Sequence, residues 1–307
     1  MNTMNKWGGN QDIEVAETKT KITVKSKKQR SITKRKLTER VITYCLLICL
    51  SLIFIFPFLW LIGTSLKPEN EAMSFPPSIL PKQWDFANYR DVFTMVSFGK
   101  YYMNSIIVTV ATVFGTVLSS TLVAYGFARI KGKGSNVWFI FLLATMMLPP
   151  QVTMIPVYMI FSKLGWTNTF LPLIVPAFFG NAYFIFLLRQ FFKTIPKELE
   201  ESAYLDGCST FGIFWRIILP LSVPSVITVA LLSFMWTWND FLGPLIYLND
   251  DSKYTLALGI LQFKGALLIE WGPMMAASLL IILPLIILFF IGQKYFVQGI
   301  ATTGGKG

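Results

Sequence analysis

The chain has 307 residues, of which 54% are hydrophobic and 14% are charged, and its net charge is +11. A soluble domain carries about 25% charged residues, so this composition indicates a polytopic membrane protein rather than a soluble core. The absence of histidine excludes Ser-His-Asp triads and histidine zinc sites, and the three cysteines lack any metal-binding spacing.

The basic charge is concentrated before the first apolar run. Residues 1–40 hold eleven Lys or Arg and four Asp or Glu, so +7 of the net charge lies there. Apart from Trp7, no aromatic residue is interleaved with these charges, and a long apolar run follows them. We therefore expect a disordered cytoplasmic tail held at anionic membrane lipid, and we expect no nucleic acid as a partner.

Six apolar runs are long enough to cross a bilayer, which takes about 20 residues. Five of them contain proline, which kinks a membrane helix but is tolerated when neighbouring groups satisfy the freed carbonyls. We therefore predict an all-α, polytopic membrane protein with six transmembrane helices near 41–64, 103–127, 137–158, 168–188, 217–239 and 274–291.

The loops between these runs differ in charge. Lys and Arg are concentrated in the connections after the second and fourth runs, on the same side as the basic N-terminus, whereas the other loops show no such excess. Cytoplasmic loops carry an excess of Lys and Arg, so both termini are expected in the cytoplasm of a bacterial cell, with the chain crossing its inner membrane several times.

None of the six predicted spans contains Asp, Glu, Lys or Arg. Proton-coupled carriers usually keep an ionisable residue near the middle of the membrane. The pattern therefore favours an energy source outside this chain, although a sodium site made of backbone carbonyls would escape this argument.

The connection after the fourth run, at about 192–216, is the long cytoplasmic loop. Pro196 and the acidic residues after it favour a helix start, and Gly207 permits a left-handed turn. Ser209 can cap a second helix, which runs into the fifth span. The small residues Ser202 and Ala203 would let another protein approach the first helix closely, although an interfacial connector without a partner fits the composition equally well.

The same loop resembles a motif of a known family. Residues 201–207 read Glu-Ser-Ala-Tyr-Leu-Asp-Gly, with Leu219-Pro220 beyond, and resemble the E-A-A-x-x-D-G…L-P loop of binding-protein-dependent ABC importer permeases. Ser202 and Cys208 stand where the family usually has alanine, and both are small. Further segments resemble the first span of these permeases and its exit (56–60 and 64–68) and the entry and exit of the second span (88–89, 104–105 and 125–129). Residues 238–241 and 293–307 resemble the carbohydrate branch, the maltose-type and multiple-sugar permeases.

The resemblance implies a division of the chain. We expect a basic tail at 1–40, a first helix at 41–64 and an extracytoplasmic loop at 65–102. A type I ABC importer transmembrane domain of five further helices would follow at 103–296, with a cytoplasmic C-terminal tail at 297–307.

The resemblance also implies partners and a mechanism. The chain would be the permease subunit of an ATP-driven importer, paired with a second homologous permease, two copies of a cytoplasmic ATPase and an extracytoplasmic solute-binding protein that delivers a sugar or oligosaccharide. The loop helix would dock in a groove of the ATPase. The residues implied in this coupling are Glu201, Ser202, Ala203, Asp206, Gly207 and Pro220.

The C-terminal tail, with Gly304, Gly305, Lys306 and Gly307, resembles the family tail that reaches the ATPase pair. A phosphate-binding loop requires G-x-x-x-x-G-K-[ST]; here Ile300 takes the place of its first glycine, and Gly307 that of its Ser or Thr. We therefore expect no ATPase site, no cofactor and no metal on this chain, because ATP and Mg²⁺ would be bound by the partner ATPase.

A solute contact is predicted near the outer end of the fifth run. Trp236, Asn239 and Asp240 lie at i, i+3 and i+4, on one helix face, and aromatic rings and amides suit sugar rings and hydroxyls. Helix packing and interface anchoring are the alternatives for each residue. Nothing in the spans identifies the solute, and two other functions stay open, an ion-coupled secondary sugar carrier and a non-transporting membrane assembly factor.

Overall fold

The structure, a computed structural model, describes residues 39–265 and 269–304. Within these ranges every regular element is a helix, and the one β contact is an isolated bridge between Lys264 and Ile269. The predicted all-α class is therefore confirmed. The chain divides into two compact units, Met1–Trp60 and Leu61–Gly307, which are described separately.

The described part of the first unit is helical. The helix begins at Glu39 and continues across the unit boundary to Ser65, a total of 27 residues. At 1.5 Å per residue this helix is about 40 Å long, which exceeds the roughly 30 Å hydrocarbon layer of a bilayer.

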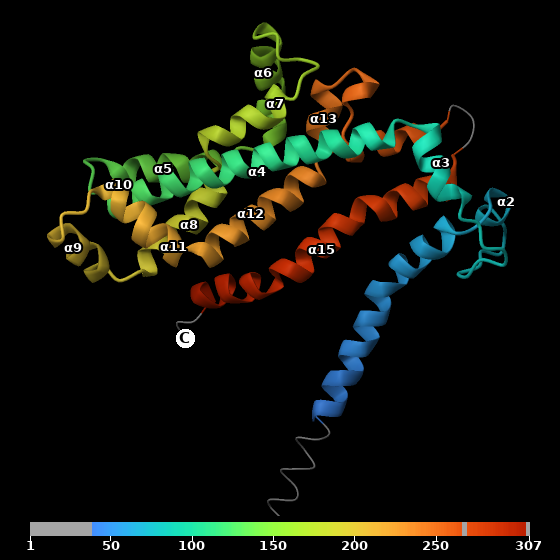
Figure 1. The fold of residues 1–307 in the computed structure, drawn as a ribbon, viewed down its shortest axis with the longest axis horizontal. Coiled ribbons are helices and arrows are strands. Elements are labelled where there is room, and N and C mark those ends of the chain that lie inside the picture. The colour runs from blue at the N-terminus through green and yellow to red at the C-terminus, as the bar shows by residue number, and fades with distance from the viewer. Residues whose placement is uncertain (1–38, 266–268, 305–307) are drawn as a thin grey trace, which may run out of the picture. The chain divides into compact units, whose positions relative to one another are not determined.

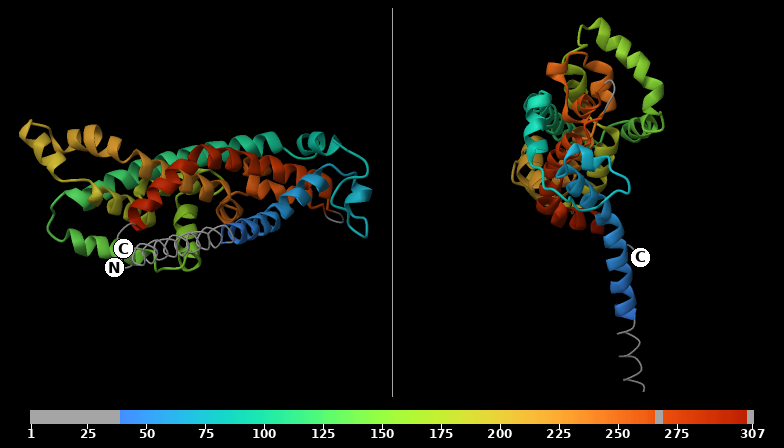
Figure 2. Two further views of the ribbon diagram at one scale, coloured as in Figure 1. Left: turned by 90° about the horizontal axis from the view of Figure 1, so that it is seen from below. Right: turned by 90° about the vertical axis from the view of Figure 1, so that its right-hand side faces the viewer.

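The second unit is built around one long helix, α4, which runs from Phe98 to Arg129 (Figure 1). The short helices α2 and α3 precede it, α5 and α6 follow it, α8 and α12 pack against it, and α15 packs against α12 (Figures 1 and 2). The bounds are α2 Glu69–Ala72, α3 Ala87–Met95, α5 Ser135–Thr145, α6 Pro150–Lys163, α7 Leu171–Ile174, α8 Ala182–Thr194, α9 Glu198–Leu205, α10 Thr210–Ile213, α11 Leu219–Leu221, α12 Val223–Trp238, α13 Leu242–Tyr247, α14 Leu256–Gly259 and α15 Trp271–Gly304.

Four shorter turns complete the second unit. The 3₁₀ turn η1 precedes α8, the π-helical turn η2 joins α10 to α11, and the 3₁₀ turns η3 and η4 flank α14. Their bounds are η1 Val175–Phe179, η2 Phe214–Ile218, η3 Asp251–Lys253 and η4 Ile260–Phe263.

Small and hydroxylated side chains line the buried side of α4, which packs against α8 and α12. Membrane helices use such residues because they let two backbones approach closely. At Gly115 a side chain is excluded by the ring of Phe178, which lies 2.6 Å from the place a Cβ would take. One turn later, the hydroxyl of Ser119 donates to the carbonyl oxygen of Ala177 at 2.8 Å. Ala177 lies in the middle of η1, so this hydrogen bond holds η1 against α4.

The buried apolar side chains form two clusters, one toward each end of α4. The first contains Tyr125 of α4 with residues of α8, α9, α10 and α12. The second contains Tyr101 of α4 with residues of α3, α12, α14 and α15. Since α4 contributes to both clusters, it connects the two ends of the second unit.

Two of the six predicted spans are bent. The predicted helix at 137–158 is broken between α5 and α6, which meet at 96°, because Pro149 and Pro150 follow the end of α5 and interrupt its hydrogen bonds. The predicted helix at 217–239 is broken at Ser222, where α11 and α12 meet at 78° between Pro220 and Pro224. The sequence indicated kinks at the prolines of these two spans, and the structure shows how sharp they are.

In the described residues, four helices are long and apolar enough to cross a membrane: Glu39–Ser65, Phe98–Arg129, Leu171–Thr194 and Trp271–Lys294. Counting each bent pair as one span gives up to six. The predicted number of six spans agrees with the structure on this count.

Candidate functional site

The predicted cytoplasmic loop folds as a helix, a glycine turn and a second helix, at one end of the second unit (Figures 1 and 2). Gly207 has a φ of 82°, the left-handed conformation that only glycine adopts without strain. Around it, the N–H of Cys208 donates to the carbonyl of Ala203 at 2.9 Å, and the N–H of Gly207 to that of Tyr204 at 3.0 Å. These two bonds form a Schellman motif and end α9 sharply. The predicted glycine turn is confirmed.

The second helix begins as predicted. The hydroxyl of Ser209 accepts a hydrogen bond from the N–H of Gly212 at 3.2 Å and caps α10. Three aromatic side chains follow on α10 and η2, and Phe214 packs against Tyr125 of α4 with ring centroids 5.1 Å apart. The return segment of the loop is therefore fixed to the same helix as α9.

A buried ion pair fixes α9 to the end of α4. Nε of Arg129 lies 3.0 Å from Oε1 of Glu200, and these side chains are only 3% and 10% exposed. Neither atom meets the geometry of a hydrogen bond with any described residue, so the contact is electrostatic. The Nη2 atom of Arg129 donates instead to the carbonyls of Phe192 and Ile195, at the end of α8. One guanidinium thus joins α4, α8 and α9.

Burial raises the pKa of Glu200 above its ordinary value of 4.5. The positive charges of Arg129 and Lys197 oppose the rise without cancelling it, and the negative charge of Glu201 adds to it. The position of α9 therefore depends on keeping Arg129 opposite a carboxylate that is costly to bury.

The outer face of α9 is open to solvent. Glu201, Ser202 and Asp206 are exposed, and so is Leu205, at 89%. The neighbouring Tyr204 is also exposed, at 49%, so this end of α9 presents apolar and acidic side chains side by side. We call Glu201, Ser202, Leu205 and Asp206 the α9 outer face.

Two of the residues predicted for coupling lie elsewhere. Ala203 is 7% exposed and belongs to the first apolar cluster, so its small side chain fits against this chain's own core and does not admit a partner. Pro220 lies in α11, directly before the bend at Ser222, where its missing N–H helps to break the helix. Of the predicted C-terminal tail, Gly304 ends α15, while Gly305, Lys306 and Gly307 lie outside the described residues.

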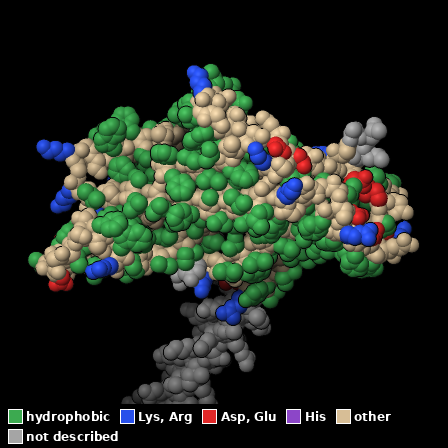
Figure 3. Space-filling model, turned by 45° about the horizontal axis from the view of Figure 1, so that its top comes forward, with side chains coloured by type: hydrophobic (Ala, Val, Ile, Leu, Met, Phe, Trp, Pro, Cys, Tyr) green, Lys and Arg blue, Asp and Glu red, His purple; other side chains and the backbone are tan. Residues whose placement is uncertain are grey.

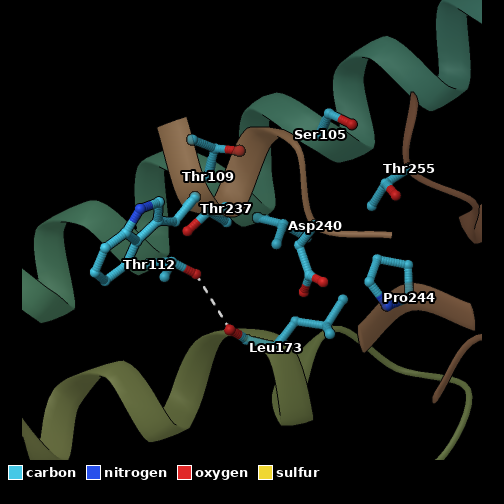
Figure 4. A pocket seen from close by; sticks show the side chains of 10 residues that line it. Ser105, Thr109, Thr112, Leu173, Thr237, Asp240, Pro244 and Thr255 are labelled. Carbon is cyan, nitrogen blue, oxygen red and sulfur yellow. Dashed lines mark hydrogen bonds between the residues drawn. The ribbon is translucent and has the colours of Figure 1, made fainter. Parts of the chain in front are cut away.

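Beside the N-terminal half of α4, a cavity of about 310 Å³ lies between α4, α7, α12 and the segment that follows α12 (Figure 4). Five hydroxyl side chains line it: Ser105, Thr109, Thr112, Thr237 and Thr255. Thr112 is already engaged, because its hydroxyl donates to the carbonyl of Leu173 at 3.2 Å.

Asp240 supplies the acidic group of this cavity. Its carboxylate extends toward Leu173 and Pro244 (Figure 4) and accepts a hydrogen bond from the N–H of Gly243 at 3.1 Å. Burial raises the pKa of Asp240 above 3.8, and the N–H groups of Gly243 and Leu242 partly offset the rise. A Cβ at Gly243 would lie 2.4 Å from this carboxylate, so any side chain there would force the carboxylate to move.

The other two predicted solute residues behave differently. Trp236 lines the cavity, but its ring also packs against Phe184, with centroids 4.9 Å apart. Asn239 is exposed, does not line the cavity, and donates to the carbonyl of Met235 at the end of α12. The structure therefore brings Trp236 and Asp240 together at one cavity and leaves Asn239 outside it.

Comparison with known proteins identifies the family. The binding-protein-dependent transport system inner membrane component family matches residues 120–302, more than half of the chain. This chain is a member of that family.

Individual members extend the match. The probable ABC transporter permease protein YurM of Bacillus subtilis is 40% identical over 253 residues, covering 82% of this chain and 84% of that protein. The arabinooligosaccharides transport system permease protein AraQ of the same organism is 34% identical, covering 84% and 92%. A solved bacterial ABC transporter that imports the acidic polysaccharide alginate shares the fold, with a TM-score of 0.76 over 83% of this permease and 24% identity.

Sequence reasoning missed the pair that holds α9 on this permease. Arg129 counted only as a marker of the cytoplasmic side, and Glu200 only as an acid near a helix start. The two residues are 71 positions apart, so no local pattern connects them. An arginine at the end of the second predicted span and two adjacent acids in the helix after the fourth span would have justified testing the pair.

Proposed function

We propose that this permease forms half of the path by which an ATP-driven importer takes up a sugar or oligosaccharide, delivered by an extracytoplasmic binding protein. The chain would lie in the bacterial inner membrane with both termini in the cytoplasm. A second, homologous permease would form the other half, and two copies of a cytoplasmic ATPase would bind ATP and Mg²⁺. This permease would then carry no catalytic site, no cofactor and no metal of its own.

The observation that carries the coupling proposal is the α9 outer face on a helix fixed to α4. A partner ATPase that binds Glu201 and Leu205 would move α9 when it moves. The ion pair of Arg129 and Glu200 would transmit that movement to α4. Alternating access then follows, because the N-terminal half of α4 lines the cavity. The left-handed turn at Gly207 would keep the outer face of α9 directed toward the ATPase, and Asp206 is the C-cap residue of α9.

The solute class rests on the cavity and on the relatives. A ring of hydroxyls with one carboxylate can exchange hydrogen bonds with the hydroxyls of a sugar, and Trp236 offers an aromatic face. The relatives include a permease named for arabinooligosaccharides, and the shared fold is that of an alginate importer.

Uptake of radiolabelled sugars in cells tests both parts of the proposal. Glu201→Ala should abolish ATP-dependent uptake while the protein stays in the membrane, and Glu198→Ala, which removes another exposed acid from the same helix, should not. Uptake that survives ATP depletion but collapses with the ion gradient would instead identify a secondary carrier. Asp240→Asn should reduce sugar uptake without changing the amount of ATPase that copurifies; unchanged uptake would remove this cavity from the path.

A further inference from the structure

A second cavity, of about 760 Å³, lies where α4 ends and α5 begins. Four basic side chains line it, and its lining contains no acidic residue. These four are Lys131, Lys133, Arg189 and Lys193. The coupling site and the solute cavity use none of them.

Arg189 is the fixed member of this basic set. It is 7% exposed, its Nε donates to the carbonyl of Phe127 at 3.2 Å, and its guanidinium lies 3.8 Å over the ring of Phe139. Among the described residues, no carboxylate lies within 4.0 Å of Arg189 or of the three lysines. A buried charge is costly without a compensating partner, so the cavity wall favours an anion.

The start of α5 adds to this preference. Gly134, with a φ of 79°, precedes the helix, and no side chain caps its first N–H groups. Ser135, Asn136 and Val137 all line the cavity. The partial positive charge of an eleven-residue helix therefore borders the same space as the four basic side chains.

The surface beside the cavity is apolar. Trp138 and Phe141 on α5 are 68% and 61% exposed, with ring centroids 6.1 Å apart, and α5 belongs to one of the bent spans. Tryptophan near a span end is typical of the membrane interface. Basic side chains lie at both ends of the face in Figure 3, and apolar side chains cover much of the surface between them. A soluble phosphate would use the basic cavity only, whereas a phospholipid would use both surfaces.

We propose that the cavity between α4, α5 and α8 binds the headgroup phosphate of an anionic phospholipid, with its acyl chains against Trp138 and Phe141. The lysines hold the phosphate, Arg189 supplies the buried positive charge, and the N-terminus of α5 completes the cradle. Arg189 and Lys193 lie on α8, whose end is held by Arg129, so a bound lipid braces the helices that carry α9.

Native mass spectrometry of the intact, delipidated importer, titrated with phosphatidylglycerol or phosphatidylcholine, tests the proposal. The pocket variant carries Lys131→Gln, Lys133→Gln and Lys193→Gln. The control variant carries Lys82→Gln, Lys163→Gln and Lys264→Gln, which removes the same charge from exposed positions outside the cavity. The parent complex should retain phosphatidylglycerol in preference to phosphatidylcholine, and the pocket variant should bind it at least about tenfold more weakly. The control variant should match the parent.

Three results would overturn the proposal. The first is equal phosphatidylglycerol binding by the pocket variant and the parent. The second is displacement of the lipid by millimolar inorganic phosphate, which would identify a site for a free anion. The third is a pocket variant that keeps the lipid but loses the ATPase subunits, since the cavity would then be part of the contact between subunits.

Discussion

The pair of Arg129 and Glu200 gives the sharpest test of how α9 is held. In Arg129→Met the carboxylate of Glu200 stays buried without its cation, and the carbonyls of Phe192 and Ile195 lose a donor. The stranded carboxylate can escape by taking up a proton. At pH 7 this costs about 3 kcal/mol for a group of ordinary pKa, which limits the electrostatic penalty to roughly that value.

Hydrogen exchange of the backbone amides of α9, in the intact importer in lipid nanodiscs, measures this loss directly. A loss of about 3 kcal/mol lowers the protection of these amides on the order of a hundredfold. Arg216→Met is the matched control, because Arg216 is exposed at the same end of the molecule. Its protection should equal that of the parent.

A double-mutant cycle separates the pair from its surroundings. Glu200→Gln alone removes the carboxylate charge, and Glu200→Gln in the Arg129→Met background should restore part of the protection, because no charge is then stranded. Strictly additive losses, or an Arg129→Met variant with the protection of the parent, would refute the bracing role of this pair.

The remaining predictions concern the turn, the cavity and pH. Gly207→Val should weaken uptake far more than Gly207→Asn, because a β-branched residue is strained at a φ of 82° whereas asparagine tolerates the left-handed conformation; equal uptake by the two variants would contradict this. Gly243→Ala should lower sugar uptake about as much as Asp240→Asn, because the new methyl group would displace the Asp240 carboxylate, and Gly99→Ala, with open space around its Cβ position, serves as control. The hydrogen-exchange protection of the α9 amides, corrected for intrinsic exchange rates, should fall as pH rises from about 4.5 toward neutrality. The reason is that the raised pKa of Glu200 makes folded α9 bind this proton more tightly than the unfolded segment does. Glu200→Gln should remove this dependence on pH.

Local patterns in the sequence were sufficient for much of the fold. Apolar length predicted six spans, and the glycine and serine of the loop predicted its turn and its cap because these conformations depend on residues only a few positions apart. The prolines indicated kinks at both bent spans, but the angles of 96° and 78° were not predicted. A proline permits a kink, but its angle depends on how the flanking helices pack, which no short stretch of sequence contains.

The candidate sites also combine features that follow from local sequence with features that depend on packing between distant segments. The exposed position of Glu201 follows from the motif, whereas the burial of Glu200 depends on an arginine of another helix. Spacing placed Trp236, Asn239 and Asp240 on one helix face, but α12 ends at Trp238. The directions of Asn239 and Asp240 therefore depend on the turn that follows the helix, and of these two only Asp240 reaches the cavity.

The length of α4 has a mechanical consequence. The α4 residues that line the hydroxyl-lined cavity, Ser105 to Thr112, lie about 25 to 36 Å along the helix from the arginine that holds α9. If the helix pivots as a rigid rod about Arg129, a tilt of about 5° displaces these cavity residues by roughly 3 Å, which is about the donor–acceptor distance of a hydrogen bond. Under the proposed function, a small tilt of α4 would therefore be large enough to break hydrogen bonds between a bound solute and Ser105, Thr109 or Thr112, without any change in the internal hydrogen bonds of the helix.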